Sequence, residues 1–298
     1  MTDTTLQQDD LMTELLAAHP QVGRLMWFTV DDAPVDQAQW LQAMVQAGLT
    51  TYGTPTGLSA STAFLRGLHA MKRATTDRTL LRRVIREKGR TVHHWIEEKV
   101  SNGVVDFRVL ASIERDTQYD RVTTKRWDTL EPSEDAALSR LPEFIETAGR
   151  TYTPGDRRRQ VRQWLGKVGA LQMAAAGPVQ FVPEEASSLI ETLTHAQSDL
   201  GLHVWSMPLA RSADVIGTLT QSLDAEVTKK TASLLEAINK TRQGGKTPTT
   251  GQQAKLVAQL HDLTTRVQHY SNIFGEQLDN LTGQIDLAKR AVRGVLDA

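Results

Sequence analysis

The sequence contains no cysteine, and this absence excludes several kinds of chemistry. The chain cannot form disulfides, bind a metal through thiolates or use a cysteine nucleophile. Aromatic residues are also scarce, at 5% of 298 residues, and no apolar run approaches the ~20 residues of a transmembrane helix. The first residues, Met1-Thr2-Asp3, lack the basic and then apolar layout of a signal peptide. We therefore expect a cytoplasmic protein with no membrane partner.

Familiar catalytic and metal-binding motifs are missing too. No G-x-G-x-x-G, G-x-S-x-G or H-E-x-x-H occurs. Gly245-Lys246-Thr247 resembles the end of a phosphate-binding loop, but Lys240 stands where that loop needs its first glycine. His93 and His94 are neighbours on an expected strand, so they point to opposite faces and cannot share a metal ion. We expect no cofactor, no metal site and no catalysis, with an enzyme of unrecognised type as an alternative.

The net charge of −1 argues against a dedicated polyanion binder, but the charge is unevenly distributed. Residues 1–60 contain seven acids and one base, whereas residues 71–90 contain eight bases and two acids. Such asymmetry gives information about partners rather than about the fold.

The C-terminal stretch, residues 212–298, has the pattern of two long amphipathic helices joined by a tip at residues 243–251. In the second helix, apolar residues recur three and four positions apart, which is typical of a coiled-coil seam. One extra four-residue step occurs at Phe274, and we interpret it as a stutter. The seam consists of Leu256, Leu260, Leu263, Val267, Tyr270, Phe274, Leu281, Ile285 and Val292. Basic side chains near the tip include Lys240, Arg242 and Lys246.

Two interpretations of this hairpin remain open. It could pack on its own chain and serve stability alone. It could instead be an arm that self-associates into a homo-oligomer or docks a protein partner.

Residues 1–211 predict an α+β body. An antiparallel meander is expected at about residues 79–129 and a helical part at about residues 133–200, with a break near Pro142 and a helix over residues 154–175. Residues 24–30 and 203–207 each predict a short strand containing a tryptophan, and both strands could lie in one sheet.

Three details of the meander can be predicted from its sequence. Alternation of Val105, Phe107, Val109, Ala111 and Ile113 with polar residues predicts a half-buried strand. The preceding Asn102-Gly103 predicts a type I′ turn. Residues 80–87 fit either a helix or a strand, and we assign a strand.

Two groups of arginines form candidate nucleic-acid-binding surfaces. The first comprises Arg82, Arg83, Arg86 and Arg90, and the second comprises Arg157, Arg158, Arg159 and Arg162. If the groups are adjacent, they could hold phosphates. They could equally be solvated surfaces neutralised by nearby acids. On a strand, Arg82 and Arg86 would share one face. Few aromatic residues lie near them (His93, Trp95 and Trp127), so base stacking has little support from the sequence.

The N-terminal part of the chain resembles an uncharacterised family found in bacteria and their phages. The resemblance rests on Trp27-Phe28-Thr29, on Ala63-Phe64-Leu65-Arg66 and on the arginine-rich strand region, and it covers about the first 130 residues. That family has no assigned activity, so the resemblance implies an accessory protein rather than a metabolic enzyme. We therefore expect a non-catalytic interaction or assembly protein that uses the hairpin, and the alternative is a nucleic-acid-binding accessory protein.

Overall fold

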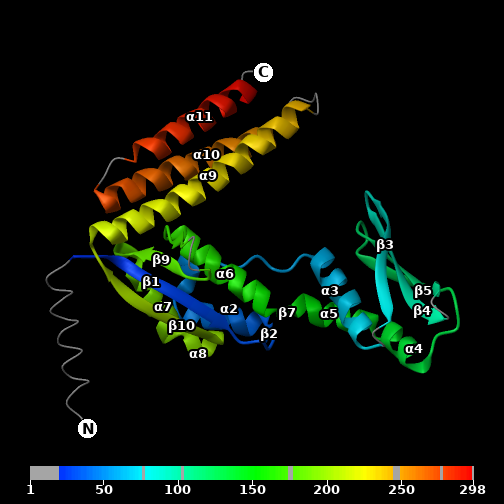
Figure 1. The fold of residues 1–298 in the computed structure, drawn as a ribbon. Helices are drawn as coiled ribbons and strands as arrows, with labels where there is room; N and C mark the ends of the chain where they lie inside the picture. Colours follow the sequence, from blue (N-terminus) through cyan, green and yellow to red (C-terminus); the bar gives the residue numbers. More distant parts are fainter. Residues whose placement is uncertain are drawn as a thin grey trace, which may run out of the picture. The chain divides into compact units, whose positions relative to one another are not determined.

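The computed structural model describes residues 20–75, 78–101, 104–173, 177–243, 249–275 and 278–296. These residues form helices and antiparallel sheets (Figure 1), which confirms the expected α+β class. They make up two compact units. The first unit holds residues 20–31, 43–53 and the chain from 157 onward, and the second holds residues 32–42 and 54–156. This division differs from the expected boundary at residue 211, because the C-terminal helices share a core with the sheet of the first unit.

A four-stranded antiparallel sheet organises the first unit. Its strands, in spatial order, are β10 (Leu202–Ala210), β1 (Gln21–Val30), β9 (Gln180–Pro183) and β8 (Leu171–Gln172). Trp27 of β1 pairs directly with Trp205 of β10, and the two rings stack with their centroids 6.4 Å apart. The two tryptophan-containing strands expected from the sequence therefore lie side by side in one sheet.

Among the described residues, four short helices accompany this sheet: η1 (Leu49–Tyr52), η2 (Glu184–Ala186), α7 (Ser187–His195) and α8 (Gln197–Leu200). Two further helices, α2 (Gln37–Gln46) and α6 (Pro154–Lys167), contain residues of both units. The expected extent of α6 to residue 175 is wrong. The helix ends at Lys167 because Gly169 takes a left-handed conformation with φ of 79°, and Leu171 then pairs with Phe181 of β9.

The C-terminal region contains three helices in the part that the structure describes, packed against one another (Figure 1). They are α9 (Ala213–Gln243), α10 (Thr250–Phe274) and α11 (Asp279–Leu296). The expected second helix is therefore two helices, and the spacing change at Phe274 marks a helix end rather than a stutter. Gly275 closes α10 in a left-handed conformation with φ of 68°. The Arg211 guanidinium donates to the carbonyls of Ile273 and Phe274, which satisfies backbone acceptors that a helix end leaves free.

One apolar core joins these three helices to the sheet of the first unit. Val22, Leu171 and Phe181 come from the sheet, and they pack in the same cluster as the buried side chains of α9, α10 and α11. Each such side chain contributes about 1.5–3 kcal/mol when it is fully buried. The C-terminal helices are therefore an integral part of the first unit.

A four-stranded antiparallel meander forms the second unit, as expected. Its strands follow chain order: β3 (Thr79–Glu87), β4 (Arg90–Ser101), β5 (Val104–Asp116) and β6 (Arg121–Arg126). The assignment of residues 80–87 to a strand is confirmed, whereas the expected turn at Asn102-Gly103 lies outside the described residues. Helices α3 (Ala60–Arg73), α4 (Pro132–Ser139) and α5 (Leu141–Arg150) accompany the sheet, and α5 begins just before Pro142, close to the expected break. A short pair, β2 (Val35–Asp36) and β7 (Thr151–Tyr152), completes the unit.

Only one face of the meander is covered by these helices. Trp95, Ala111 and Ile113 are buried in a cluster with side chains of α3, α4 and α5. The pairing of β4 with β5 shifts between Trp95 and Ile96, so that Leu110 is an extra residue in β5. Val109 and Ala111 consequently lie on opposite faces. The expected single face from Val105 to Ile113 is therefore wrong, and Val105 and Phe107 are exposed.

Among the residues that the structure describes, no helix combines the length and the hydrophobicity needed to cross a bilayer.

Candidate functional site

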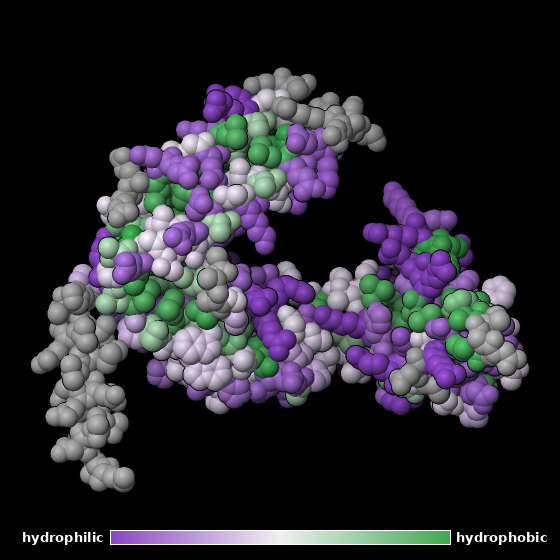
Figure 2. All heavy atoms as spheres, in the orientation of Figure 1, coloured by the Kyte–Doolittle hydropathy of each residue, from purple (hydrophilic) through white to green (hydrophobic). Residues whose placement is uncertain are grey.

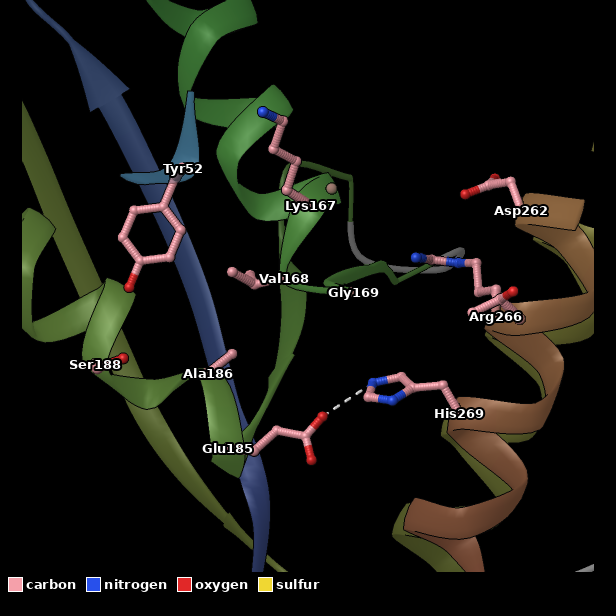
Figure 3. Close-up of a pocket in the computed structure, with 12 residues that line it drawn as sticks. Tyr52, Lys167, Val168, Gly169, Glu185, Ala186, Ser188, Asp262, Arg266 and His269 are labelled. Carbon is pink, nitrogen blue, oxygen red and sulfur yellow. Dashed lines mark ion pairs between the residues drawn. The ribbon is translucent and has the colours of Figure 1, made fainter. Parts of the chain in front are cut away.

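A pocket of about 430 Å³ lies in the first unit, between α10 and the segment that follows α6 (Figure 3). The ionisable side chains that line it are those of Tyr52, Lys167, Glu185, Asp262, Arg266 and His269. Figure 3 shows Glu185 and His269 pointing toward each other, with 3.3 Å between a carboxylate oxygen and the ring Nε2. Within the described residues, no group of three or more His, Asp or Glu side chains is placed to hold a metal ion.

The polar groups around this pocket serve to attach α10 to the rest of the unit. Arg266 donates to the Ala170 carbonyl at 2.6 Å and pairs with Glu226 at 2.8 Å. The Tyr270 hydroxyl donates to the Gly169 carbonyl at 2.6 Å, and burial raises the pKa of this tyrosine, so it remains a protonated donor. These contacts give Arg266 and the neighbouring Tyr270 a structural role.

A different candidate surface lies on the second unit, where the first group of arginines is found. Arg82, Arg83 and Arg86 are exposed on β3, and β3 is an edge strand of the meander. Arg90 is also exposed, at the start of β4, where it forms a bidentate pair with Glu114 at 2.8 and 2.9 Å.

The expectation that Arg82 and Arg86 share a face is wrong. The pairing of β3 with β4 shifts between Arg83 and Ile85, so Arg82 stands opposite His94 while Arg86 stands opposite Thr91. His94 and Thr91 are three residues apart on a regular strand and therefore point to opposite faces. Cationic side chains thus occur on both faces of this sheet edge.

The face of the meander that lies opposite the helices is here called the outer face. The strand register places one row of polar side chains straight across it, one from each strand: Arg82, His94, Ser112 and Lys125. Arg82 and Lys125 are exposed at the two ends of this row, and both are positive. The sequence did not single out Lys125, because only the pairing of four strands brings it into line with Arg82.

Trp127 lies beside this row just after β6. Its Nε1 donates to the Ser112 hydroxyl at 2.6 Å, and its backbone N–H donates to the Leu110 carbonyl at 3.0 Å. The Lys125 ammonium lies 4.3 Å from the centroid of the indole ring, within the range of a cation–π contact. Trp127 is therefore held in place by two hydrogen bonds to β5 while 56% of its surface remains exposed.

Apolar side chains continue the outer face on one side of the polar row. Leu80, Ile96 and Val109 stand in the next row, followed by Phe107 and then by Val100 opposite Val105. Phe107 is 57% exposed. Where Figure 1 labels β3, β4 and β5, Figure 2 shows hydrophobic surface bordered by hydrophilic side chains. Exposed apolar side chains that gather in one place commonly mark a binding surface.

The second group of arginines lies on α6 in the first unit, and its members differ from one another. Arg157 is only 1% exposed and donates to the carbonyls of Leu200 and Asp31, which is a structural role. Arg158, Arg159 and Arg162 are exposed. The two groups of arginines belong to different units.

The hairpin residues are partly described. Lys240 is exposed and pairs with Glu236, whereas the Arg242 side chain and Lys246 lie outside the described part of the chain. In the seam, Leu260 is partly buried, and the other eight residues are buried in the core of the first unit. The seam therefore has an intramolecular partner, and self-association or docking through it stays a prediction.

Comparison with known proteins shows how far the family relationship extends. No curated protein and no solved structure shows significant similarity to this chain. The resemblance found in the sequence covers about the first 130 residues, whereas a family model matches residues 21–298 and so takes in both structural units. The chain belongs to a family of unknown function, DUF6744.

Proposed function

We propose that the protein is a nucleic-acid-binding accessory protein, and that the arginines of β3 contact the phosphate backbone. The observation that carries this proposal is the exposure of Arg82, Arg83 and Arg86 along an edge strand, with cationic side chains directed to both faces. Phosphate contacts supply most of the sequence-independent affinity of nucleic-acid-binding proteins.

Edge protection is a structural alternative for the same residues. Charged side chains on an edge strand prevent a second sheet from pairing with it, and arginines on β3 would serve that purpose. The two explanations predict different results when the charge is removed while the polar character of the strand is retained.

The proposal is tested with the full chain and a variant carrying Arg82→Gln, Arg83→Gln and Arg86→Gln. Binding to labelled DNA and RNA is measured by fluorescence anisotropy at several salt concentrations. Each lost phosphate contact reduces the slope of log K against log salt by about 0.7–0.9. We therefore expect the slope of the triple variant to fall by about 2 to 3, with weaker binding at every salt concentration.

A matched control removes exposed arginines elsewhere in the same unit. Arg140, the N-cap residue of α5, pairs with Glu143, and Arg150 at the end of α5 pairs with Glu146; both arginines are exposed. Replacing this pair with glutamine should leave the slope unchanged. An unchanged slope in the β3 variant, together with a new tendency to aggregate, would instead support edge protection and overturn the proposal.

A further inference from the structure

The outer face of the meander carries exposed aromatic rings as well as positive charge, and this combination favours a single strand of nucleic acid over a duplex. Phe107 and Trp127 expose more than half of their surfaces, at 57% and 56%. Trp127 lies beside the row that carries Arg82 and Lys125 at its ends, and Phe107 lies two rows away from it on the same face. Aromatic side chains next to a cationic groove are the usual platform for successive unpaired bases.

We propose that the outer face binds a single strand of nucleic acid, with unpaired bases stacked on Trp127 and Phe107 and with Arg82 and Lys125 contacting phosphates. This inference rests on the proposed function, which does not itself distinguish single strands from duplexes. A duplex keeps its bases stacked on each other, so it presents no free base to these rings.

The position of Trp127 supports a binding role for its indole ring. The two hydrogen bonds to Ser112 and Leu110 fix the ring on the sheet without burying it. A ring that is already ordered loses little conformational entropy when a base stacks on it. The Lys125 ammonium lies over the same ring, 4.3 Å from its centroid, so a base that stacks on this face displaces the ammonium, which then pairs with the phosphate of the bound nucleotide.

The positive charge that an anionic ligand needs lies in the polar row, which contains two cations and no acid. In the polar row, the exposed ends are Arg82 and Lys125, both cations. The outer face also carries acids. Glu114 is bound to Arg90, and Glu98 stands opposite Phe107 and is partly buried. Glu87 and Asp116 share a row with Arg90 and Arg121, two rows beyond the polar row on the side away from Phe107.

Phe107 and Ser112 stand opposite Glu98 and His94, which are four residues apart on β4. The two positions are therefore roughly 13 Å apart at about 3.3 Å per residue, a length that one strand of several nucleotides can cover.

The inference is tested with the full chain and two variants, Trp127→Leu and Phe107→Leu, which remove the ring but keep an apolar side chain. Anisotropy is measured with a labelled oligothymidine of about 15 nucleotides, with oligouridine and with a duplex. We expect each variant to bind the single strands about 5- to 150-fold more weakly, because one stacking contact is lost. The slope against salt should stay the same, because no phosphate contact is removed.

Two further variants separate stacking from damage to the fold. Trp127→Phe keeps an aromatic ring but loses the bond to Ser112, and it should restore most of the affinity that Trp127→Leu loses. Tyr119→Leu removes a ring that is 74% exposed in the turn between β5 and β6, and it should bind like the unchanged protein.

The outcomes distinguish this inference from the proposed function. Equal binding by Trp127→Leu, Phe107→Leu and Tyr119→Leu would overturn the stacking inference, and the outer face would then be assigned to another partner such as a protein. If duplex binding is also strong and depends on the β3 arginines, the proposed function stands without the inference. If neither single strands nor duplexes bind at low salt, both proposals fail.

Discussion

At the scale of single residues, the buried side chain of His93 makes the stability of the protein depend on pH. Its side chain is 5% exposed, packs against the Phe64 ring, and its Nδ1 has no hydrogen-bond partner within the described residues. Burial lowers the pKa of His93, and the nearby charges of Arg83 and His69 lower it further. The folded protein thus holds this imidazole in its neutral form.

The sign of the resulting pH dependence is fixed. The pKa of His93 is lower in the folded state than its unfolded value near 6.5, so the unfolded chain binds more protons below that pH. We expect the free energy of unfolding to fall as the pH decreases below about 6.5, by up to about 1.4 kcal/mol per pH unit for this group. Urea denaturation at several pH values measures this loss.

A comparison of two histidine variants isolates the effect. His93→Leu should lose less stability on acidification than the unchanged protein, although it is less stable overall. His261 is exposed on α10, and His261→Leu should keep the full acid sensitivity. If the unchanged protein and His93→Leu lost equal stability on acidification, the loss could not be assigned to His93.

At the scale of elements, the approach of α3 to α5 depends on one missing side chain. A Cβ added to Gly67 would lie 2.5 Å from Cγ1 and 2.8 Å from Cα of Ile145. Because the second of these is a backbone atom, the helices would have to move apart. We expect Gly67→Ala to destabilise the protein by about 1–2 kcal/mol, since overpacking exceeds the helix-propensity gain of about 1 kcal/mol.

The same substitution in an open position provides the control. Gly217 lies in α9, and a Cβ added there would meet no atom within 4 Å. Gly217→Ala should therefore stabilise the protein by up to about 1 kcal/mol. Thermal unfolding of the two variants would contradict the packing argument if both shifted in the same direction by similar amounts.

Individual elements also show where sequence patterns succeed and fail. The meander and its order could be predicted because β-branched and aromatic residues alternate with polar ones over long stretches. The faces of β3 and β5 could not be predicted, because the extra residues at Val84 and Leu110 are set by pairing between strands and have no local signature. Similarly, nothing in the sequence distinguishes the buried Arg157 from its exposed neighbour Arg158. Only the structure shows that the Arg157 guanidinium donates to the carbonyls of Leu200 and Asp31.

At the scale of the whole molecule, the C-terminal helices decide what association is expected. An apolar seam with heptad-like spacing suggests a partner helix, but here α9, α11 and the sheet of the first unit bury it within one chain. We therefore expect a monomer with a mass near 33.0 kDa in size-exclusion chromatography with light scattering. A dimer that persists on dilution would contradict this expectation and restore the hairpin as an assembly element.

The extra residue at Leu110 divides β5 into two stretches that can change independently. On the side of Phe107, the exposed positions can accept substitutions without altering side chains that the fold requires. On the side of Ile113, almost any change of volume disturbs a filled interior. Selection can therefore retune what the sheet recognises while the scaffold stays constant, and relatives of this chain should vary most at the exposed positions before the bulge.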